Sequence, residues 1–185
     1  MKQTVAEKIF SRKAGFEIFA GDIITAEVDA CLTNDASGPL MIDYFRKMQA
    51  DRVAHPERVA AILDHYVPCP NSRVAALQQS MFDFRDQYGI RLVDAGEGIA
   101  HQVFDELGMV RPGSLIVGGD SHTTTHGYLN CVAVGVGASD LACAVSSGEL
   151  WFKVPQSIRV DFTGTLRPGV QGKDVALYLL SRLGS

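Results

Sequence analysis

Residues 115–123 read LIVGGDSHT, and this stretch decides how the rest of the chain is interpreted. Its first three residues are apolar, which is typical of a short buried strand. The two glycines that follow allow another group to approach the backbone closely. Asp120, Ser121 and His122 then place a carboxylate, a hydroxyl and an imidazole directly after the strand. The stretch therefore predicts a buried strand that ends at a polar site.

The same arrangement recurs upstream, where three further apolar runs end in polar residues. They are Ile23–Leu32 before Thr33-Asn34-Asp35, Val59–Leu63 before Asp64 and His65, and Ile90–Val93 before a glycine-rich turn and His101. We interpret each run as a strand.

Between and after these strands, apolar residues recur at spacings of three and four and predict helices. The predicted helices are Val5–Lys13, a helix that opens at Ser37-Gly38-Pro39, Asn71–Tyr88, one tightly packed helix within Cys131–Glu149, and Asp174–Leu183 after a last strand, Ser157–Thr163. Alternating strands and helices favour an α/β fold, with a mostly parallel sheet covered by helices on both faces. We expect one domain over residues 1–185.

Sheets of this kind bind ligands at the carboxyl ends of their strands, so the polar segments should converge there. Three of the five histidines, His65, His101 and His122, lie in these segments. A carboxylate beside an imidazole fixes its orientation and stabilises its protonated form. Asp64 can pair locally with His65, and Asp120 can pair across the site with His101. The alternative for each carboxylate is to cap the helix that follows it.

Two hydrolase interpretations have less support. Ser121 and His122 lack the G-x-S-x-G nucleophile elbow. A zinc or manganese hydrolase that uses the three histidines with Asp64 and Asp120 lacks a recognisable ligand spacing.

Composition excludes several classes of partner. The chain is 46% hydrophobic and 21% charged, with a formal net charge of −4, which gives no general attraction to nucleic acid or anionic membranes. No apolar run approaches the roughly 18 residues of a membrane span, and the charged start is unlike a signal peptide. We expect a cytoplasmic protein. The four cysteines lack C-x-x-C spacing and are interpreted as small apolar residues.

Several linked motifs resemble the aconitase superfamily, and the resemblance covers the chain from Thr4 to Leu183. The motifs are Leu63-Asp64-His65 with Pro68 and Asn71, the stretch from Gly96 to Gln102, Gly119-Asp120-Ser121-His122-Thr123, and the stretch from Gly148 to Pro155. The opening Ala6-Glu7-Lys8-Ile9 resembles the isopropylmalate and homoaconitate dehydratase branch of that family.

The resemblance implies the N-terminal part of a hydro-lyase large subunit that dehydrates and rehydrates a hydroxy di- or tricarboxylate. Isopropylmalate is the first candidate, and homoaconitate and dimethylmalate are the next. It further implies that His65 with Asp64 protonates the departing hydroxyl and that His101 pairs with Asp120. Ser121 would contact the substrate, and His122 would anchor the pocket. Asp35 and Ser37 fall where the family places a substrate-pocket loop.

The resemblance also implies a 4Fe-4S cluster in the complete protein, whose ligands are not in this chain, so no metal ligand is assigned here. The remainder of the large subunit and a small, swivelling subunit would be the partners. The second hypothesis, from another functional class, is a carboxylate-binding or subunit-assembly fragment without catalysis.

Overall fold

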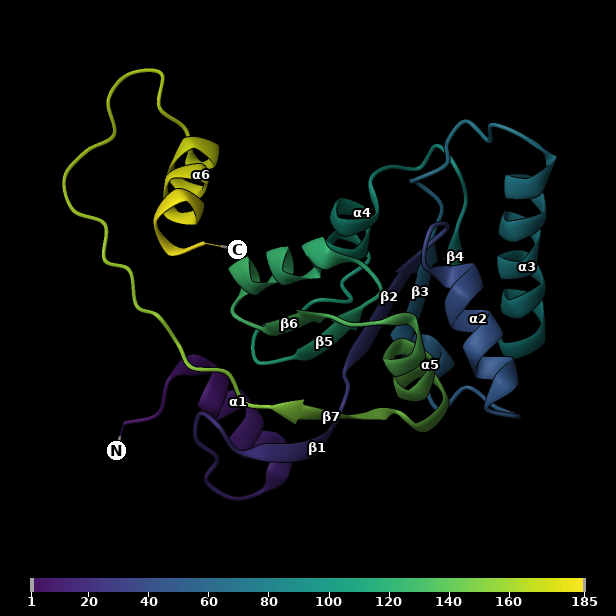
Figure 1. Cartoon of the computed structure of the whole chain (residues 1–185), viewed down its shortest axis with the longest axis horizontal. Coiled ribbons are helices and arrows are strands. Elements are labelled where there is room, and N and C mark those ends of the chain that lie inside the picture. Colours follow the sequence, from purple (N-terminus) through teal and green to yellow (C-terminus); the bar gives the residue numbers. More distant parts are fainter. Residues whose placement is uncertain (1, 185) are drawn as a thin grey trace.

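The computed structural model describes residues 2–184, so the ends of the domain expected over 1–185 lie outside the described residues. A parallel five-stranded sheet forms the centre of the molecule (Figure 1). In spatial order its strands are β4 (Arg91–Val93), β3 (Val59–Ile62), β2 (Ala30–Asn34), β5 (Leu115–Gly118) and β6 (Val132–Gly135). All four neighbouring pairs are parallel, which confirms the predicted fold class.

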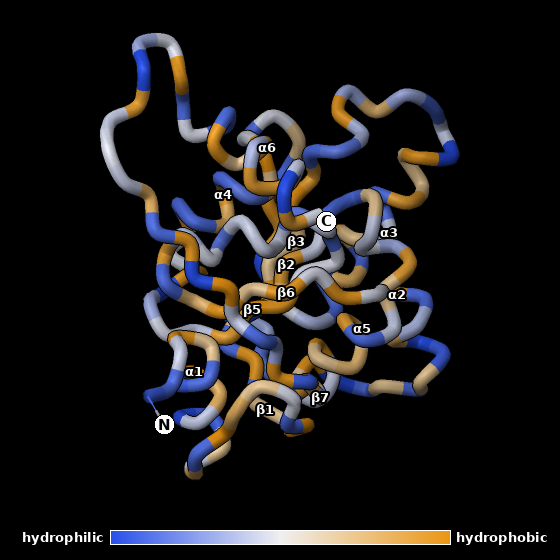
Figure 2. The backbone as a smooth tube through the Cα atoms, turned by 60° about the vertical axis from the view of Figure 1, so that its left-hand side comes forward, coloured by the Kyte–Doolittle hydropathy of each residue, from blue (hydrophilic) through white to orange (hydrophobic). Residues whose placement is uncertain are grey.

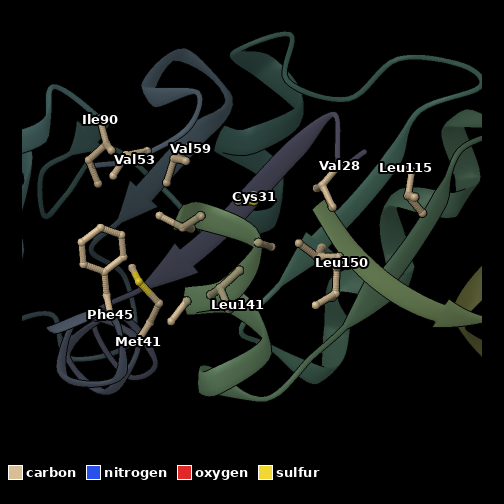
Figure 3. Packing of buried hydrophobic residues seen from close by; sticks show 14 of the residues in the cluster. Val28, Cys31, Met41, Phe45, Val53, Val59, Ile90, Leu115, Leu141 and Leu150 are labelled. Carbon is tan, nitrogen blue, oxygen red and sulfur yellow. The ribbon is translucent and has the colours of Figure 1, made fainter. Parts of the chain in front are cut away.

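Helices cover both faces of this sheet because its buried strands carry apolar side chains on both sides. On one face α2 (Gly38–Lys47), α3 (Ser72–Tyr88) and α5 (Ala138–Ser147) share one core cluster with the strands. Figure 3 shows Met41, Phe45 and Leu141 of these helices packed near Cys31 and Val59. The other face carries α4 (Ala100–Glu106) and the 3-10 helix η2 (Ser121–Leu129). Figure 2 shows the hydrophobic residues along the central strands.

A smaller antiparallel ribbon extends the first core. It pairs β1 (Ile23–Glu27) with β7 (Glu149–Lys153), and α1 (Val5–Ala14) packs beside it. Thr4 and Glu7 form a capping box at the start of α1, and Gly15 ends the helix in a left-handed conformation. The predicted helices at α1, α2, α3 and α6 (Gly172–Leu183) are confirmed, as are the strands at β3, β4 and β5. The 3-10 turn η1 (Pro56–Arg58) precedes β3.

The single strand predicted over Ile23–Leu32 is wrong, because the chain forms two strands that belong to different sheets. At the break between them, the Asp29 carboxylate accepts the backbone N–H of Leu115 at 2.8 Å and pairs with Lys13 Nζ at 2.5 Å. Apolar residues still alternate with polar ones through the break. Val28, however, packs in the core cluster shared with α2, α3 and α5, whereas Ala30 packs in the cluster on the α4 face of the sheet. The alternating pattern therefore gave no sign that the chain passes from one sheet to the other at Asp29.

Two further predictions need correction. The segment Cys131–Glu149 holds the expected helix, α5, but β6 precedes it and β7 begins at its last residue. The strand predicted over Ser157–Thr163 is not formed, since this segment is exposed and pairs with no strand among residues 2–184. It belongs to residues 156–184, the C-terminal arm, which leads to α6 away from the sheet (Figure 1).

None of the helices within residues 2–184 has the length and apolarity needed to cross a membrane.

Candidate functional site

The strand order creates a crevice at the centre of the sheet. From β2 the chain adds β3 and β4 on one side, and then β5 and β6 on the other. The loops after β2 and β5 therefore run in opposite directions, and parallel sheets bind ligands at such a point. Asn34 ends β2 and Asp120 follows β5, and Asn34 Nδ2 lies 3.3 Å from Asp120 Oδ2 across this crevice.

Asp120 is the common acceptor of the site. Its Oδ2 lies 3.2 Å from His65 Nε2, and its Oδ1 lies 3.2 Å from both His101 Nε2 and His122 Nδ1. The backbone N–H of His122 also donates to Oδ1, at 2.7 Å. Burial raises the pKa of Asp120, but these hydrogen bonds and the charge of His101 outweigh burial and hold that pKa at about 2. The predicted convergence of the three histidines is confirmed.

His65 lies between two carboxylates. Its Nδ1 is 2.6 Å from Asp64 Oδ1, while Nε2 faces Asp120, so both bonds are satisfied when both ring nitrogens carry protons. Burial lowers the pKa of His65, but Asp64 and Asp120 outweigh burial, and the pKa is raised above its ordinary value. The ring remains 36% exposed at the crevice. It is therefore an imidazole whose protonated form the two carboxylates stabilise and that a ligand can reach.

Asp64 pairs with His65 and also caps the start of α4. Its Oδ1 holds His65, and its Oδ2 accepts the backbone N–H of Ala100, the first residue of α4, at 2.7 Å. The next residue of that helix is His101, so Asp64 links the orientation of two histidines. Asp120 likewise caps η2 through the His122 N–H. Both predicted pairings are confirmed. Asp120 also caps the helix that follows it, whereas Asp64 caps α4 and not the helix that follows it, α3, whose cap is Asn71.

Asp35 lies in the interior of the protein and is fully buried. Its carboxylate accepts the backbone N–H groups of Asp64, His65 and Tyr66 and the side-chain amide of Gln78, at 2.8 to 3.2 Å. Burial raises the pKa of Asp35, but these four bonds outweigh burial and lower that pKa below its ordinary value. Asp35 thus orders the loop that carries His65 and does not face solvent.

Ser37 fixes the side-chain amide of Asn34. The Asn34 Oδ1 atom accepts the backbone N–H groups of Ala36 and Ser37 at 3.0 Å each, and the Ser37 hydroxyl at 3.1 Å. The Asn34 Nδ2 atom must therefore point the other way, toward Asp120 and His65. Ser37 itself is half-buried beside the crevice.

Ser121 and His122 form the open side of the site. The His122 side chain is 79% exposed, and Ser121 is exposed beside it, with its hydroxyl 3.4 Å from His122 Nδ1. Both can meet a molecule that approaches from solvent.

Two glycines bring the loops this close. A Cβ atom at Gly119 would lie 2.7 Å from Ser37 Oγ, and one at Gly135 would lie 2.7 Å from the carbonyl oxygen of Asp120. Such distances are too short for a real Cβ contact, so the position of Asp120 depends on glycine at both sites.

Sequence reasoning missed Asn34, His126 and Asp105 as members of the network. Asn34 stood in the polar segment that ends a predicted strand, beside Asp35, but only Asp35 was selected, from the resemblance to the family. His126 follows His122 by four residues, but the sequence gives no sign that it is buried against His101 and Asp105.

The cysteines do not form a site for an iron–sulfur cluster within the described residues. Cys31 and Cys131 belong to core clusters on opposite faces of the sheet, and Cys69 and Cys143 are exposed. Burial raises the pKa of Cys31 to about 12 and that of Cys131 to about 11, which favours the thiol over the thiolate that a cluster requires.

Asp35, Asp64 and His65 each bring one ligand-type atom to within 4.8 Å of the others, but their geometry does not favour a cation. Both oxygens of Asp35 accept hydrogen bonds, and His65 Nδ1 pairs with Asp64, so a metal ion would have to displace these interactions. This weakens the metal-hydrolase hypothesis.

Two surface hollows lie at the opposite, amino ends of the strands, where Asp29, Arg58 and Arg111 contribute to their walls. Several of their charged side chains pair with one another, as in Lys13 with Asp29 and Arg58 with Glu27. The histidine cluster is the stronger candidate because its acid–base groups converge at the strand ends where parallel sheets bind ligands.

Comparison with known proteins gives consistent matches. The family model described as Aconitase family (aconitate hydratase) matches residues 7–185. The chain is 43% identical to the probable 3-isopropylmalate dehydratase large subunit of Methanothermobacter thermautotrophicus, over 100% of this chain and 45% of that protein. It is 44% identical to the 3-isopropylmalate dehydratase large subunit of Syntrophus aciditrophicus, over 100% and 44%. The large subunit from Aquifex aeolicus is 41% identical, over 100% and 43%. The chain spans less than half the length of these curated relatives.

Proposed function

This chain belongs to the aconitase family, and from that membership we propose that it supplies one wall of the active site of a hydro-lyase acting on a hydroxy di- or tricarboxylate. The observation that carries the proposal is the imidazole of His65, held between Asp64 and Asp120 at a crevice open to solvent. Elimination of water leaves a hydroxide unless a proton reaches the departing oxygen. A clamped imidazole of raised pKa is a suitable proton donor for that step.

Each polar residue of the crevice has a role in this proposal. His65 donates the proton to the leaving hydroxyl, and Asp64 holds its ring and stabilises its charge. Asp120 holds the Nε2 side of the His65 ring from the other side of the crevice, and His101 holds Asp120 through its second carboxylate oxygen.

The pocket residues are the ones that face solvent or support the loops. Ser37, Ser121 and His122 are placed to contact substrate, with His122 as an anchor for a group on the facing wall. Asp35 contributes to the substrate pocket through the loop that it orders.

The substrate and partners follow from the names of the relatives. Those proteins are called large subunits of 3-isopropylmalate dehydratase. We therefore propose 3-isopropylmalate as substrate, with homoaconitate or 2,3-dimethylmalate as the next candidates, and a small subunit and the remainder of a large subunit as partners. Such an enzyme would work in the cytoplasm.

A 4Fe-4S cluster is expected for the family, but the cysteines described here do not fit it. In the proposed enzyme its ligands come from outside the described residues. This chain provides the proton donor and part of the pocket, and we expect the chain alone not to turn over substrate.

The test is His65→Gln in the complete assembly, assayed by dehydration of 3-isopropylmalate. Loss of a general acid should lower kcat by about 10²–10⁴-fold. His55→Gln is the matched control, because His55 lies before β3, at the opposite end of the strands, and its rate should match that of the wild type. Equal rates for wild type and H65Q would refute the role of His65. An assembly that hydrates or dehydrates none of the three acids would refute the function.

The alternative is a module that binds a carboxylate without catalysis. Its supporting observation is that the described cysteines cannot hold the cluster. Calorimetry of the chain with 3-isopropylmalate separates the two ideas. Binding by the chain, with no turnover by any complete assembly, would favour the module.

A further inference from the structure

His126 is a fully buried histidine that the proposed reaction does not use. It lies in η2, and its Nδ1 is 2.7 Å from Asp105 Oδ1 of α4. Its Nε2 is 3.2 Å from His101 Nδ1, and the other nitrogen of His101 meets Asp120. The hydroxyl of Tyr128 donates to Asp105 Oδ2 at 3.0 Å. A continuous chain of hydrogen bonds therefore runs from the edge of η2 to the centre of the crevice.

The His126 ring cannot easily turn out of this chain. The centroids of the His101 and Phe104 rings each lie 5.2 Å from the centroid of His126, and the His126 side chain has no solvent exposure. Each of its two ring nitrogens has one hydrogen-bond partner, so the orientation of the ring is fixed.

Counting protons assigns a state to each ring. The bonds from Asp105 to His126, from His126 to His101 and from His101 to Asp120 each require one hydrogen. If both carboxylates are ionised, two histidines must carry three ring protons between them. One ring is then neutral and the other is an imidazolium.

Electrostatics decides which ring is neutral. Burial lowers the pKa of His126 below its ordinary value, despite the opposing effect of Asp105, and the nearby charge of His101 lowers it further. His101 is partly exposed and contacts the ionised Asp120, and the His122 ring lies 6.3 Å away. Burial therefore disfavours a second proton on His126, whose single proton lies on Nδ1 beside Asp105, and the hydrogen in the bond between the two rings is then the one on His101 Nδ1.

We propose that His126 and Asp105 are positioning residues that act through His101. By accepting the Nδ1–H of His101, His126 keeps the Nε2–H of that ring directed at Asp120. Asp120 then remains a carboxylate whose second oxygen holds His65. The effect on catalysis rests on the proposed function, whereas the arrangement of protons does not.

The arrangement is tested by ¹⁵N NMR of the histidine rings in the wild-type chain. We expect His126 to be the Nδ1–H tautomer and to show a coupling across the N–H···N bond to His101 Nδ1. A His126 ring protonated on Nε2, or protonated on both nitrogens at neutral pH, would overturn the proposal. This measurement needs neither activity nor a variant, so its outcome is independent of whether the proposed reaction occurs.

The positioning role is tested by kinetics in the complete assembly. His126→Phe keeps an aromatic ring but accepts no hydrogen bond, and we expect kcat to fall about tenfold with KM unchanged, as for loss of one hydrogen bond. His126→Gln can accept from His101 and donate to Asp105, so it should recover most of that loss. Equal rates for H126F and H126Q would show that only volume matters and would refute the role. If H126F does not fold, Asp105→Leu replaces it, because leucine accepts no hydrogen bond from His126 Nδ1. The same fall is expected, and an unchanged kcat is the contradicting result.

Discussion

The three carboxylates of the site differ because each meets different donors. Asp35 is buried among backbone amides, Asp64 joins an imidazole to the start of a helix, and Asp120 accepts from three histidines. Their side chains have the same chemistry in the sequence. Burial and neighbours make the first an ordering residue of a loop and the third the centre of an ionic network.

Asp35→Asn should destabilise the chain strongly. The amide offers one acceptor where the carboxylate offers two, and its NH₂ group would face buried donors. We expect the free energy of unfolding to fall by about 3 kcal/mol, the cost of leaving buried groups unsatisfied. Urea unfolding measures the loss. Asp51→Asn, at an exposed position, is the control and should change stability by less than about 0.5 kcal/mol. Equal stability of the two variants would contradict the assignment.

The raised pKa of His65 makes its contribution to stability depend on pH. A group whose pKa is higher in the folded state stabilises fully below its unfolded pKa, about 6.5, and this contribution disappears as pH rises through the folded pKa. The free-energy difference between wild type and His65→Gln should therefore decrease from acid to alkaline pH. Urea unfolding at several pH values from about 5 to about 9 measures this difference. A difference that grows with pH would contradict the clamped imidazolium.

For single residues, the sequence predicts which side chains come together in the site, but it does not predict the role of each one. His65, His101, His122 and Asp120 follow strand ends, so topology brings them together. The burial of Asp35 could not be predicted, because an acid in a loop has the same pattern whether it faces a ligand or backbone amides.

Among the elements, β6 and α4 were not predicted from the sequence. β6 has four residues inside a small-residue segment, which is too short for its alternation to stand out. α4 has seven residues and follows a glycine-rich turn, and its first turn is held by Asp64 from another loop. Long helices such as α3 carry enough apolar repeats to be predicted from sequence alone.

Gly135→Ala should disturb the site from a neighbouring strand. Its Cβ atom would press on the backbone carbonyl of Asp120, which cannot move as a flexible side chain would. We expect a loss of about 1–3 kcal/mol in unfolding free energy, together with altered histidine ring signals. Gly127→Ala is the control, since a Cβ there meets nothing within 4 Å. Unchanged His101 and His65 signals in G135A would contradict this account.

On the scale of the whole molecule, the C-terminal arm differs from the rest. Residues 158–162 alternate apolar and polar side chains, as a half-buried strand would, but no described strand lies beside them. The backbone N–H and C=O groups of an extended segment without a neighbouring strand form hydrogen bonds only with water. Alternation of apolar and polar residues is therefore not enough to form a strand. The alternating pattern was identified correctly. The strand prediction failed because the sequence does not show whether another strand lies beside this segment.

Removal of residues 156–185 should leave the remaining fold intact. No side chain described in the arm is buried, and α6 buries none. We expect the unfolding free energy to change by less than about 0.5 kcal/mol, and limited trypsin digestion to cleave first at the exposed Arg159. Removal of residues 1–21 is the contrasting variant. It deletes the buried Phe10 and Ile18 and should cost several kcal/mol, at about 1.5–3 kcal/mol for each large apolar side chain. A large loss on removing the arm would contradict this division.

The exposure of Ser121 and His122 affects whether the site can distinguish the two enantiomers of a hydroxy acid. All the polar groups described for the crevice lie at the carboxyl ends of the strands of one sheet, so a bound hydroxy acid is contacted by this chain from that end only. Two mirror-image acids can present the same carboxylate and hydroxyl to such a surface and differ only in what points away from it. Discrimination between enantiomers must then come from the polypeptide that closes the opposite side. The chain alone should bind both enantiomers with nearly equal affinity.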